Sequence, residues 1–313
     1  MVDKIRSKIP ISADWVLKRI KEGKIVRLKN AIIEGDLDIE ELDLPTKHVD
    51  RTKIQKQRGF KEDVGIIKSP INIINSEIKE NTNFSNTAFS GDVWFEGAIF
   101  SGDAWFEGAI FSGDAWFEGA TFSKNAWFDG TIFSRLAWFD GTKFEGDVLT
   151  FRDANFTHAS SQEAACRKAK NVLEKNGDRE EAGYHFYQEM EGKRKQKAWY
   201  FRYPEFIFIQ LIFGYGVHPL RLMACWFLAA TIFAISYYAN GGILSKLPVS
   251  SLPKTYSYFI ECFYFSIVTA VTPGYGKYEL TSWVYQVIAS IEAIFGTFMW
   301  AAFIATFARK YMK

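Results

Sequence analysis

The chain has 313 residues, and its 38 Lys and Arg nearly balance its 36 Asp and Glu, which leaves a formal net charge of +2. This balance argues against a nucleic-acid-binding protein, which usually presents a strongly basic surface. The length suggests about two domains, and aromatic residues, at 17%, are abundant for a soluble protein. Cys166, Cys225 and Cys262 are too widely spaced for a metal site, and we expect reduced, buried thiols.

The first segment, residues 1–24, is predicted to be an N-terminal helix or cap. Residues 1–29 are charged throughout and contain no apolar core of the signal-peptide type. We therefore expect everything before the first membrane span to stay in the cytoplasm.

Residues 25–157 are predicted to form one repeat domain, because Phe recurs at spacings that alternate between five and six. The regular positions are Phe84, Phe89, Phe95, Phe100, Phe106, Phe111, Phe117, Phe122, Phe128, Phe133, Phe139 and Phe144. Each unit has a small residue, any residue, Phe and two polar or small residues. These units resemble the pentapeptide-repeat family, which implies a right-handed quadrilateral β-helix. Residues 33–37 and 71–78 look like degenerate coils of the same solenoid.

In that geometry the small residue and the Phe point inward, so Ala104 and Phe106 belong to the core while Trp105 points outward. The Phe residues are then a structural ladder rather than ligand-binding aromatics. Coils of about 22 residues would place the tryptophans on two opposite faces, with Trp94, Trp116 and Trp138 on one and Trp105 and Trp127 on the other. Exposed tryptophan ladders favour an interface, and the alternative is that they only shield the coil edges from water.

Carboxylates recur with the same period, at Asp92, Asp103 and Asp114 and at Glu96, Glu107, Glu118, Asp129 and Asp140. Catalysis or metal binding needs one specific site. Carboxylates that are copied at every turn therefore favour solvated faces and turn capping.

Residues 158–198 are polar and rich in Ala, Glu and Lys, with a break at residues 176–178, and they predict a helical hairpin. Asp178 and Glu181 have the form of a capping box for the second helix, whose apolar face would carry Ala182, Phe186, Tyr187 and Met190. Similar hairpins join repeat domains to pores in prokaryotic pentapeptide-repeat channels, which implies a coupling element or a spacer. The aromatic run that opens residues 199–218 predicts an interfacial helix along the inner membrane surface.

Two apolar stretches, residues 219–239 and 282–308, are long enough to cross the hydrocarbon core as an outer and an inner helix. Basic residues precede the first and follow the second, so both termini are expected in the cytoplasm. The loop between the spans would enter the membrane from outside. We therefore expect a multi-pass membrane protein, and the resemblance to prokaryotic pentapeptide-repeat channels implies the plasma membrane of a prokaryote.

Between the spans, residues 256–272 predict a pore helix, and residues 272–276 end in Gly-Tyr-Gly. The motifs Tyr264-Phe265-Ser266, Val268-Thr269 and Thr272-x-Gly274-Tyr275-Gly276 closely resemble the pore signature of two-transmembrane potassium channels. The resemblance covers residues 219–313 and implies a homotetramer. It also implies a filter in which backbone carbonyls replace the hydration shell of K⁺, built from Thr272, Pro273, Gly274, Tyr275 and Gly276.

Two filter positions depart from the family. Pro273 stands where Val or Ile is usual, and Lys277 stands where Asp is usual, at the outer mouth. A ring of Lys277 side chains would disfavour cations unless each pairs, for instance with Glu279. A second Gly-Tyr-Gly, residues 214–216, lacks the preceding Thr residues and is predicted to be a turn before a helix.

The inner helix carries the gating candidates. Gly296 lies near the hinge position of the family, with close helix packing as the alternative. If the family register holds, Thr297, Trp300 and Ile304 face the pathway. Glu292 is an ionisable group at membrane depth, and we favour a role in bracing the pore helix over one in attracting cations.

The leading prediction is a tetrameric potassium channel in the lipid bilayer, with a cytoplasmic repeat domain that regulates gating or mediates assembly. The alternatives are a non-selective cation channel and a membrane-anchored scaffold whose repeats bind another protein. We expect no nucleic-acid partner, no cofactor, and no metal besides K⁺ as the permeating ion. The chain is not expected to be an enzyme, because no phosphate-binding loop, nucleophile elbow or His-Glu-x-x-His motif is found.

Overall fold

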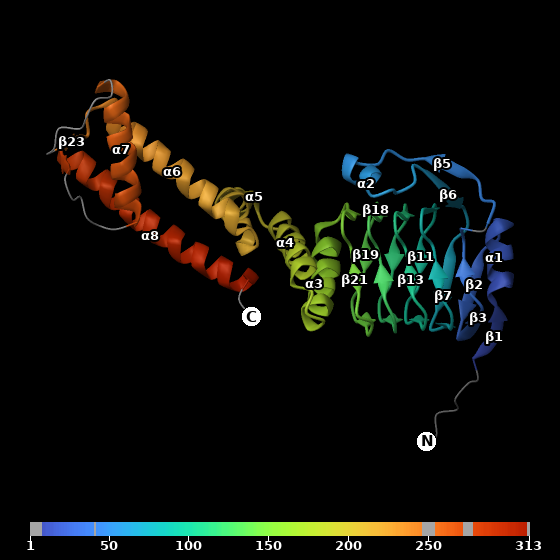
Figure 1. The fold of residues 1–313 in the computed structure, drawn as a ribbon. Helices are drawn as coiled ribbons and strands as arrows, with labels where there is room; N and C mark the ends of the chain where they lie inside the picture. The colour runs from blue at the N-terminus through green and yellow to red at the C-terminus, as the bar shows by residue number, and fades with distance from the viewer. Residues whose placement is uncertain (1–7, 41, 246–253, 272–277, 312–313) are drawn as a thin grey trace, which may run out of the picture. The chain divides into compact units, whose positions relative to one another are not determined.

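The computed structural model describes residues 8–40, 42–245, 254–271 and 278–311. The chain divides into two compact units, Met1–Arg202 and Tyr203–Lys313. Figure 1 shows parallel strands in the first unit and helices in the second.

The first unit is a four-sided β-solenoid, because its short parallel strands stack into four sheets. One sheet has the strand order β1 (Ile9–Ser12), β3 (Ala31–Glu34), β8 (Glu77–Ile78), β12 (Ile99–Phe100), β16 (Thr121–Phe122) and β20 (Lys143–Phe144). A second sheet has the order β22 (Asn155–Phe156), β18 (Ile132–Phe133), β14 (Ile110–Phe111), β10 (Thr87–Phe89), β6 (Asp63–Ile67) and β5 (Thr46–His48), of which only β5 is antiparallel to its neighbour.

The other two sheets carry the tryptophans on opposite sides of the coil. The first tryptophan sheet is β19 (Ala137–Trp138), β15 (Ala115–Trp116), β11 (Val93–Trp94), β7 (Ile71–Ile74) and β2 (Val26–Lys29). The second tryptophan sheet is β21 (Leu149–Thr150), β17 (Ala126–Trp127), β13 (Ala104–Trp105), β9 (Thr82–Asn83) and β4 (Leu37–Asp38). The register pairs Trp94 with Trp116 and Trp105 with Trp127, as the 22-residue coil predicts.

The predicted phenylalanine ladder is confirmed as the core of this unit. Phe106 is fully buried and stacks on Phe128 with 4.8 Å between ring centroids and 2° between ring planes. Phe128 in turn stacks on Phe151, which is 23 positions on, so the last coil contains one extra residue. Helix α1 (Ala13–Lys21) packs Ala13, Val16 and Ile20 onto the first coils and covers that end of the core.

The tryptophans are half-buried, which corrects the expectation of exposed ladders. Trp116 and Trp138 stack with only 3.7 Å between ring centroids, and Trp105 and Trp127 lie 5.5 Å apart and parallel. Stacked rings cover one another, so each exposes less of its surface than an isolated indole would. Their role in an interface stays a prediction.

The repeated aspartates cap turns, as predicted. Asp92 accepts a hydrogen bond from the backbone N–H of Asp114, one coil on, and Asp114 does the same for Leu136. Glu96, Glu118 and Asp140 are exposed. Glu107 and Asp129 are half-buried, and burial raises the pKa of both carboxyl groups.

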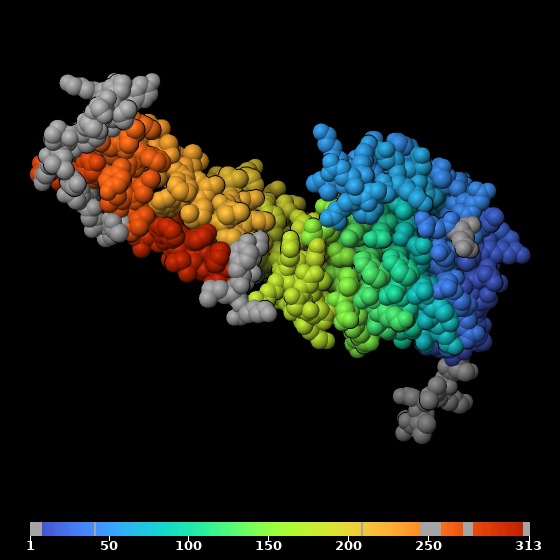
Figure 2. Space-filling view, in the orientation of Figure 1, coloured from blue at the N-terminus to red at the C-terminus, as the bar shows by residue number. Residues whose placement is uncertain are grey.

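A segment that the sequence did not suggest interrupts the predicted 25–157 solenoid between β4 and β6. Its described part, residues 42–62, contains β5 and α2 (Lys53–Gln57) and lies over one edge of the coils, where Figures 1 and 2 show it in light blue. We call it the strap. Its Arg51, only 4% exposed, donates hydrogen bonds to the carbonyl oxygens of Gly108 and Gly130 in two successive coils. Gln55 donates to Gly130 O and Asp153 O.

The other end of the solenoid is closed by α3 (Ala159–Lys175) and α4 (Arg179–Lys195), the predicted helical hairpin. Their side chains bond backbone N–H groups that the last coils would otherwise leave open. Ser161 Oγ accepts from Ala137 N at 3.0 Å, and His185 Nε2 accepts from Phe151 N at 2.9 Å. One half of the predicted capping box is present, because Asp178 accepts from Glu181 N, but the Glu181 carboxylate pairs with Arg152 instead.

The predicted apolar face of α4 is right for Ala182 and wrong for its three larger residues. The buried residues of this helix are Ala182, His185, Glu189, Gly192 and Arg194, whereas Phe186, Tyr187 and Met190 are only half-buried. The polar residues can face inward because they have partners. Glu189 forms ion pairs with Lys170 and Arg167 of α3, and although burial alone would raise the pKa of this carboxyl group, these cations lower it.

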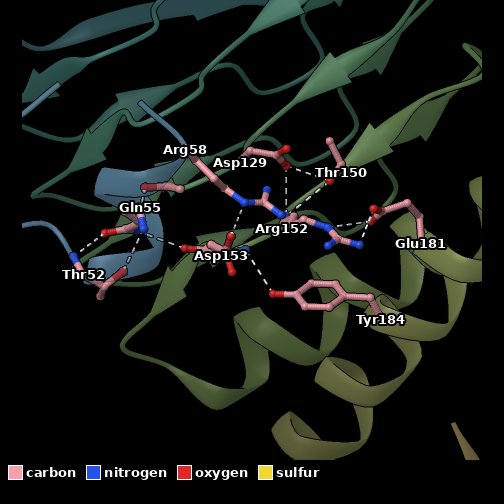
Figure 3. Close-up of polar contacts among 10 residues, drawn as sticks. Thr52, Gln55, Arg58, Asp129, Thr150, Arg152, Asp153, Glu181 and Tyr184 are labelled. Atoms are coloured by element: carbon pink, nitrogen blue, oxygen red, sulfur yellow. Dashed lines mark hydrogen bonds and ion pairs between the residues drawn. The ribbon is translucent and has the colours of Figure 1, made fainter. Parts of the chain in front are cut away.

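The strap and the hairpin meet at one turn of the last coil (Figure 3). Arg58 of the strap forms an ion pair with Asp153 at 2.9 Å, and Tyr184 Oη of α4 accepts from Asp153 N at 3.0 Å. The neighbouring Arg152 pairs with Glu181 of α4. Two segments far apart in the sequence are thereby both fixed to Asp153.

The predicted single interfacial helix, residues 199–218, is broken into three pieces. These are α5 (Trp199–Pro204), a π-helical segment η1 (Glu205–Ile212) and a 3₁₀ turn η2 (Gly214–Gly216). Pro204 ends α5 because proline has no N–H to continue the helical bonding. In η2, Tyr215 has a φ of 52°, so this Gly-Tyr-Gly is the turn that its sequence predicted.

Candidate ion pathway

The second unit is built on three helices: α6 (Pro219–Ala239), α7 (Lys254–Val271) and α8 (Trp283–Tyr311). Helices α6 and α8 are long and apolar enough to cross a membrane. Both present large exposed apolar side chains, such as Leu220 at 80% and Ile294 at 72% exposure. An apolar surface of this extent is typical of contact with lipid or with other protein copies.

Helix α7, the predicted pore helix, packs against both spans. Its Cys262 and Phe265 share a buried cluster with Ala234 and Tyr237 of α6 and with Ala289 of α8. The helix therefore contacts both α6 and α8. Contacts on two sides would fix the position of its C-terminal end, as a pore helix requires.

The filter residues Thr272, Pro273, Gly274, Tyr275 and Gly276, with Lys277, lie outside the described residues. Both flanks of this segment are described. The segment starts directly after α7, which ends at Val271, and it ends directly before β24 (Tyr278–Leu280). Strand β24 pairs antiparallel with β23 (Ile243–Ser245), which follows α6. The sequence analysis missed this two-stranded sheet, whose strands of three residues carry no repeated pattern.

Glu292 of α8 lies between the other two helices and is 1% exposed. Its Oε2 accepts a hydrogen bond from Tyr237 Oη of α6 at 2.8 Å, and its Oε1 is bonded to Ser266 Oγ of α7. Ser266 Oγ also bonds Ala230 O of α6 at 2.8 Å. Tyr237, 55 residues from Glu292 in the sequence, was not singled out, because no local motif marks a partner so distant.

Gly296, one turn after Glu292, lies where close helix packing leaves no room for a side chain. A Cβ atom here would lie 2.1 Å from Ala270 O, at the end of α7. Such a separation is far inside van der Waals contact, so only glycine fits. A hinge at this position stays a prediction.

The three residues predicted to line the pathway differ in exposure in the single chain. Thr297 and Ile304 are exposed, Ile304 at 62%. Trp300 is half-buried, and its ring lies 6.2 Å from the ring of Trp226 on α6. In the single chain, Trp300 thus faces the outer helix.

Comparison with known families identifies both units. Residues 73–121, 84–132 and 106–155 match the family model of pentapeptide repeats, and residues 221–313 match the ion channel family model. The chain joins pentapeptide repeats to an ion channel domain. Neither family is an enzyme family. No curated protein and no solved structure matches significantly.

Proposed function

We propose that this channel chain assembles as a homotetramer and conducts K⁺ selectively across a prokaryotic plasma membrane, with both termini in the cytoplasm. The observation that carries the proposal is the position of α7. This helix packs against both candidate spans through Cys262 and Phe265 and ends at Val271, directly before Thr272 to Gly276 in the sequence. A pore helix must deliver a filter strand in this way.

Several copies are needed because one chain can offer only one side of a ring of carbonyls. The exposed apolar surfaces of α6 and α8 are available for lipid and for neighbouring subunits. Four copies would place four filter segments and four inner helices around one axis.

The test is ion flux from liposomes that contain the purified full-length protein, under opposed K⁺ and Na⁺ gradients. We expect K⁺-driven flux that Gly274→Ala abolishes, because alanine resists the left-handed backbone angles that a carbonyl filter uses. Gly177→Ala, in the turn between α3 and α4, is the matched control, because Gly177 has a left-handed φ of +83° outside the proposed filter and a Cβ there meets no atom within 4 Å. Wild-type flux that Gly274→Ala leaves intact would contradict the assigned filter.

A weakly selective cation channel is the second candidate, and Pro273 and Lys277 favour it. Proline removes one backbone N–H that could brace the filter from behind, and Lys277 adds positive charge at the outer mouth. Under this alternative K⁺ and Na⁺ fluxes are equal, and the double variant Pro273→Val with Lys277→Asp raises the K⁺ preference.

For the repeat domain we propose a role in gating or assembly, through contacts of the two tryptophan sheets with other subunits or with a protein partner. The hairpin supports this role, because bonds to His185 and Tyr184 fix it to the last coil. Deletion of residues 1–156 should change the open probability. Unchanged gating, with retained binding of another protein, would favour the scaffold alternative instead.

A further inference from the structure

Glu292 is a buried carboxyl group in a helix that we treat as membrane-spanning. An ionised carboxylate at such a site is costly unless a cation or several donors compensate it. Among the described residues, no Lys, Arg or His forms an ion pair with Glu292, and its carboxyl oxygens are bonded to the hydroxyl groups of Tyr237 and Ser266.

The number of hydrogens in this network determines its protonation. Three contacts join four oxygen-bearing groups: Tyr237 Oη to Glu292 Oε2, Glu292 Oε1 to Ser266 Oγ, and Ser266 Oγ to Ala230 O. Each hydroxyl group supplies one hydrogen, and a backbone carbonyl only accepts. Three hydrogen bonds need three hydrogens, but Tyr237 and Ser266 supply two. The third must therefore come from Glu292.

A single arrangement satisfies all three contacts. Tyr237 donates to Oε2 of Glu292, protonated Oε1 donates to Ser266 Oγ, and Ser266 donates to Ala230 O. An ionised Glu292 would compete with Ala230 O for the one hydrogen of Ser266, and one contact would be lost.

The contact between Glu292 and Ser266 is one of two successive contacts between α8 and α7. Four residues on in each helix, Gly296 packs against Ala270. Residues four apart lie on the same helix face, so the two contacts together set the register between the inner helix and the pore helix. Ser266 lies five residues before Val271, the last residue of α7, a rise of about 7.5 Å along the helix.

We propose that Glu292 is a neutral carboxylic acid that joins the outer, pore and inner helices and so positions the chain that leads into the filter. Its role in positioning the filter rests on the proposed channel function. Its protonation does not, because it follows from the three contacts alone. Glu292 is a positioning residue under this proposal, and its charge takes no part in attracting cations.

The first experiment reads protonation directly. Infrared spectra of the full-length protein in detergent are recorded at about pH 8, where exposed carboxyl groups are ionised. We expect the C=O stretching band of a protonated carboxylic acid in the wild type, its loss in Glu292→Gln, and its retention in Glu261→Gln, a control on α7. If Glu292→Gln leaves the C=O stretching region of the spectrum unchanged, the proposal is overturned.

The second experiment reads positioning. In Glu292→Gln the amide oxygen can accept from Tyr237, and the amide NH₂ group can donate to Ser266. This variant should therefore retain K⁺ flux and ion selectivity. Glu292→Ala removes two buried hydrogen bonds and should lower flux by at least about tenfold, the change expected for losing one of them. Ser266→Ala, which keeps the bond between Tyr237 and Glu292, should lower flux in the same direction but less. Equal losses in Glu292→Gln and Glu292→Ala would instead assign the role to charge. An absence of flux in the wild type would refute the channel proposal, and the infrared result would still decide the protonation of Glu292.

Discussion

The junction between the solenoid and the hairpin should lose stability in acid, because His185 is held there in its neutral form. The side chain is fully buried. Its Nε2 accepts from Phe151 N, and its Nδ1 lies 2.9 Å from Glu181 O, which can only accept. The hydrogen is therefore on Nδ1, and a second proton on Nε2 would face the N–H of Phe151. Burial lowers the pKa of His185 from 6.5 to about 4.

The sign follows from proton uptake. Between pH 6.5 and about 4 the unfolded chain binds a proton at His185 and the folded chain does not. Stability is therefore complete above pH 6.5 and falls as the pH falls toward 4. A shift of about 2.5 units corresponds to about 3 kcal/mol at most.

The assay is urea unfolding of residues 1–202, which form one compact unit. Unfolding is monitored by circular dichroism, once at pH 7.5 and once at pH 4.5. His185→Gln supplies an acceptor for Phe151 N but does not titrate. It should therefore lose about 2.5 kcal/mol less than the wild type over this range. His48→Gln is the matched control, because the His48 side chain is 63% exposed. Wild type and His185→Gln with the same pH dependence would refute the reasoning.

Two further predictions concern the same unit and the same unfolding assay. Phe117→Ala should cost about 3–5 kcal/mol, because its fully buried ring stacks between Phe95 and Phe139. A cost no larger than that of the half-buried Phe144→Ala would contradict the ladder as the main source of stability. Gly130→Ala should cost more than Gly119→Ala. Both positions have a φ near +65°, but the new Cβ would lie 2.6 Å from the Phe60 ring of the strap at Gly130 and at least 3.9 Å from any atom at Gly119. Equal costs would mean that the strap does not press on this turn.

The coils could be predicted because each contact of a repeat unit recurs in every coil at the same sequence spacing. Phe106 meets Phe128, its equivalent one coil on, so one spacing determines the whole ladder. The same reasoning correctly placed Trp105 outside and Asp92 as a cap. It overestimated the exposure of the tryptophans, because spacing gives the direction of a side chain and not how closely its neighbours cover it.

Contacts made only once were not predictable in this way. The strap is held by Arg51 and Gln55, which bond turns 57 to 98 residues away and belong to no repeat. The buried face of α4 was missed for a related reason. His185 and Glu189 look like surface residues until the partners that compensate them, Phe151 N and Lys170, are known.

The channel unit contains a recognisable sequence motif and also contacts that no motif marks. Its motif predicted the helix that the structure has at α7, but the partners of Glu292 come from two other helices. These contacts bear on the predicted hinge. Before Gly296 the inner helix is attached to the pore helix and the outer helix by one directional hydrogen bond each, whereas after it Met299 contacts Leu222 and Trp226 of the outer helix through apolar packing. Apolar packing is non-directional, so a bend at Gly296 would keep the first segment fixed to the filter support and let the second slide against the outer helix.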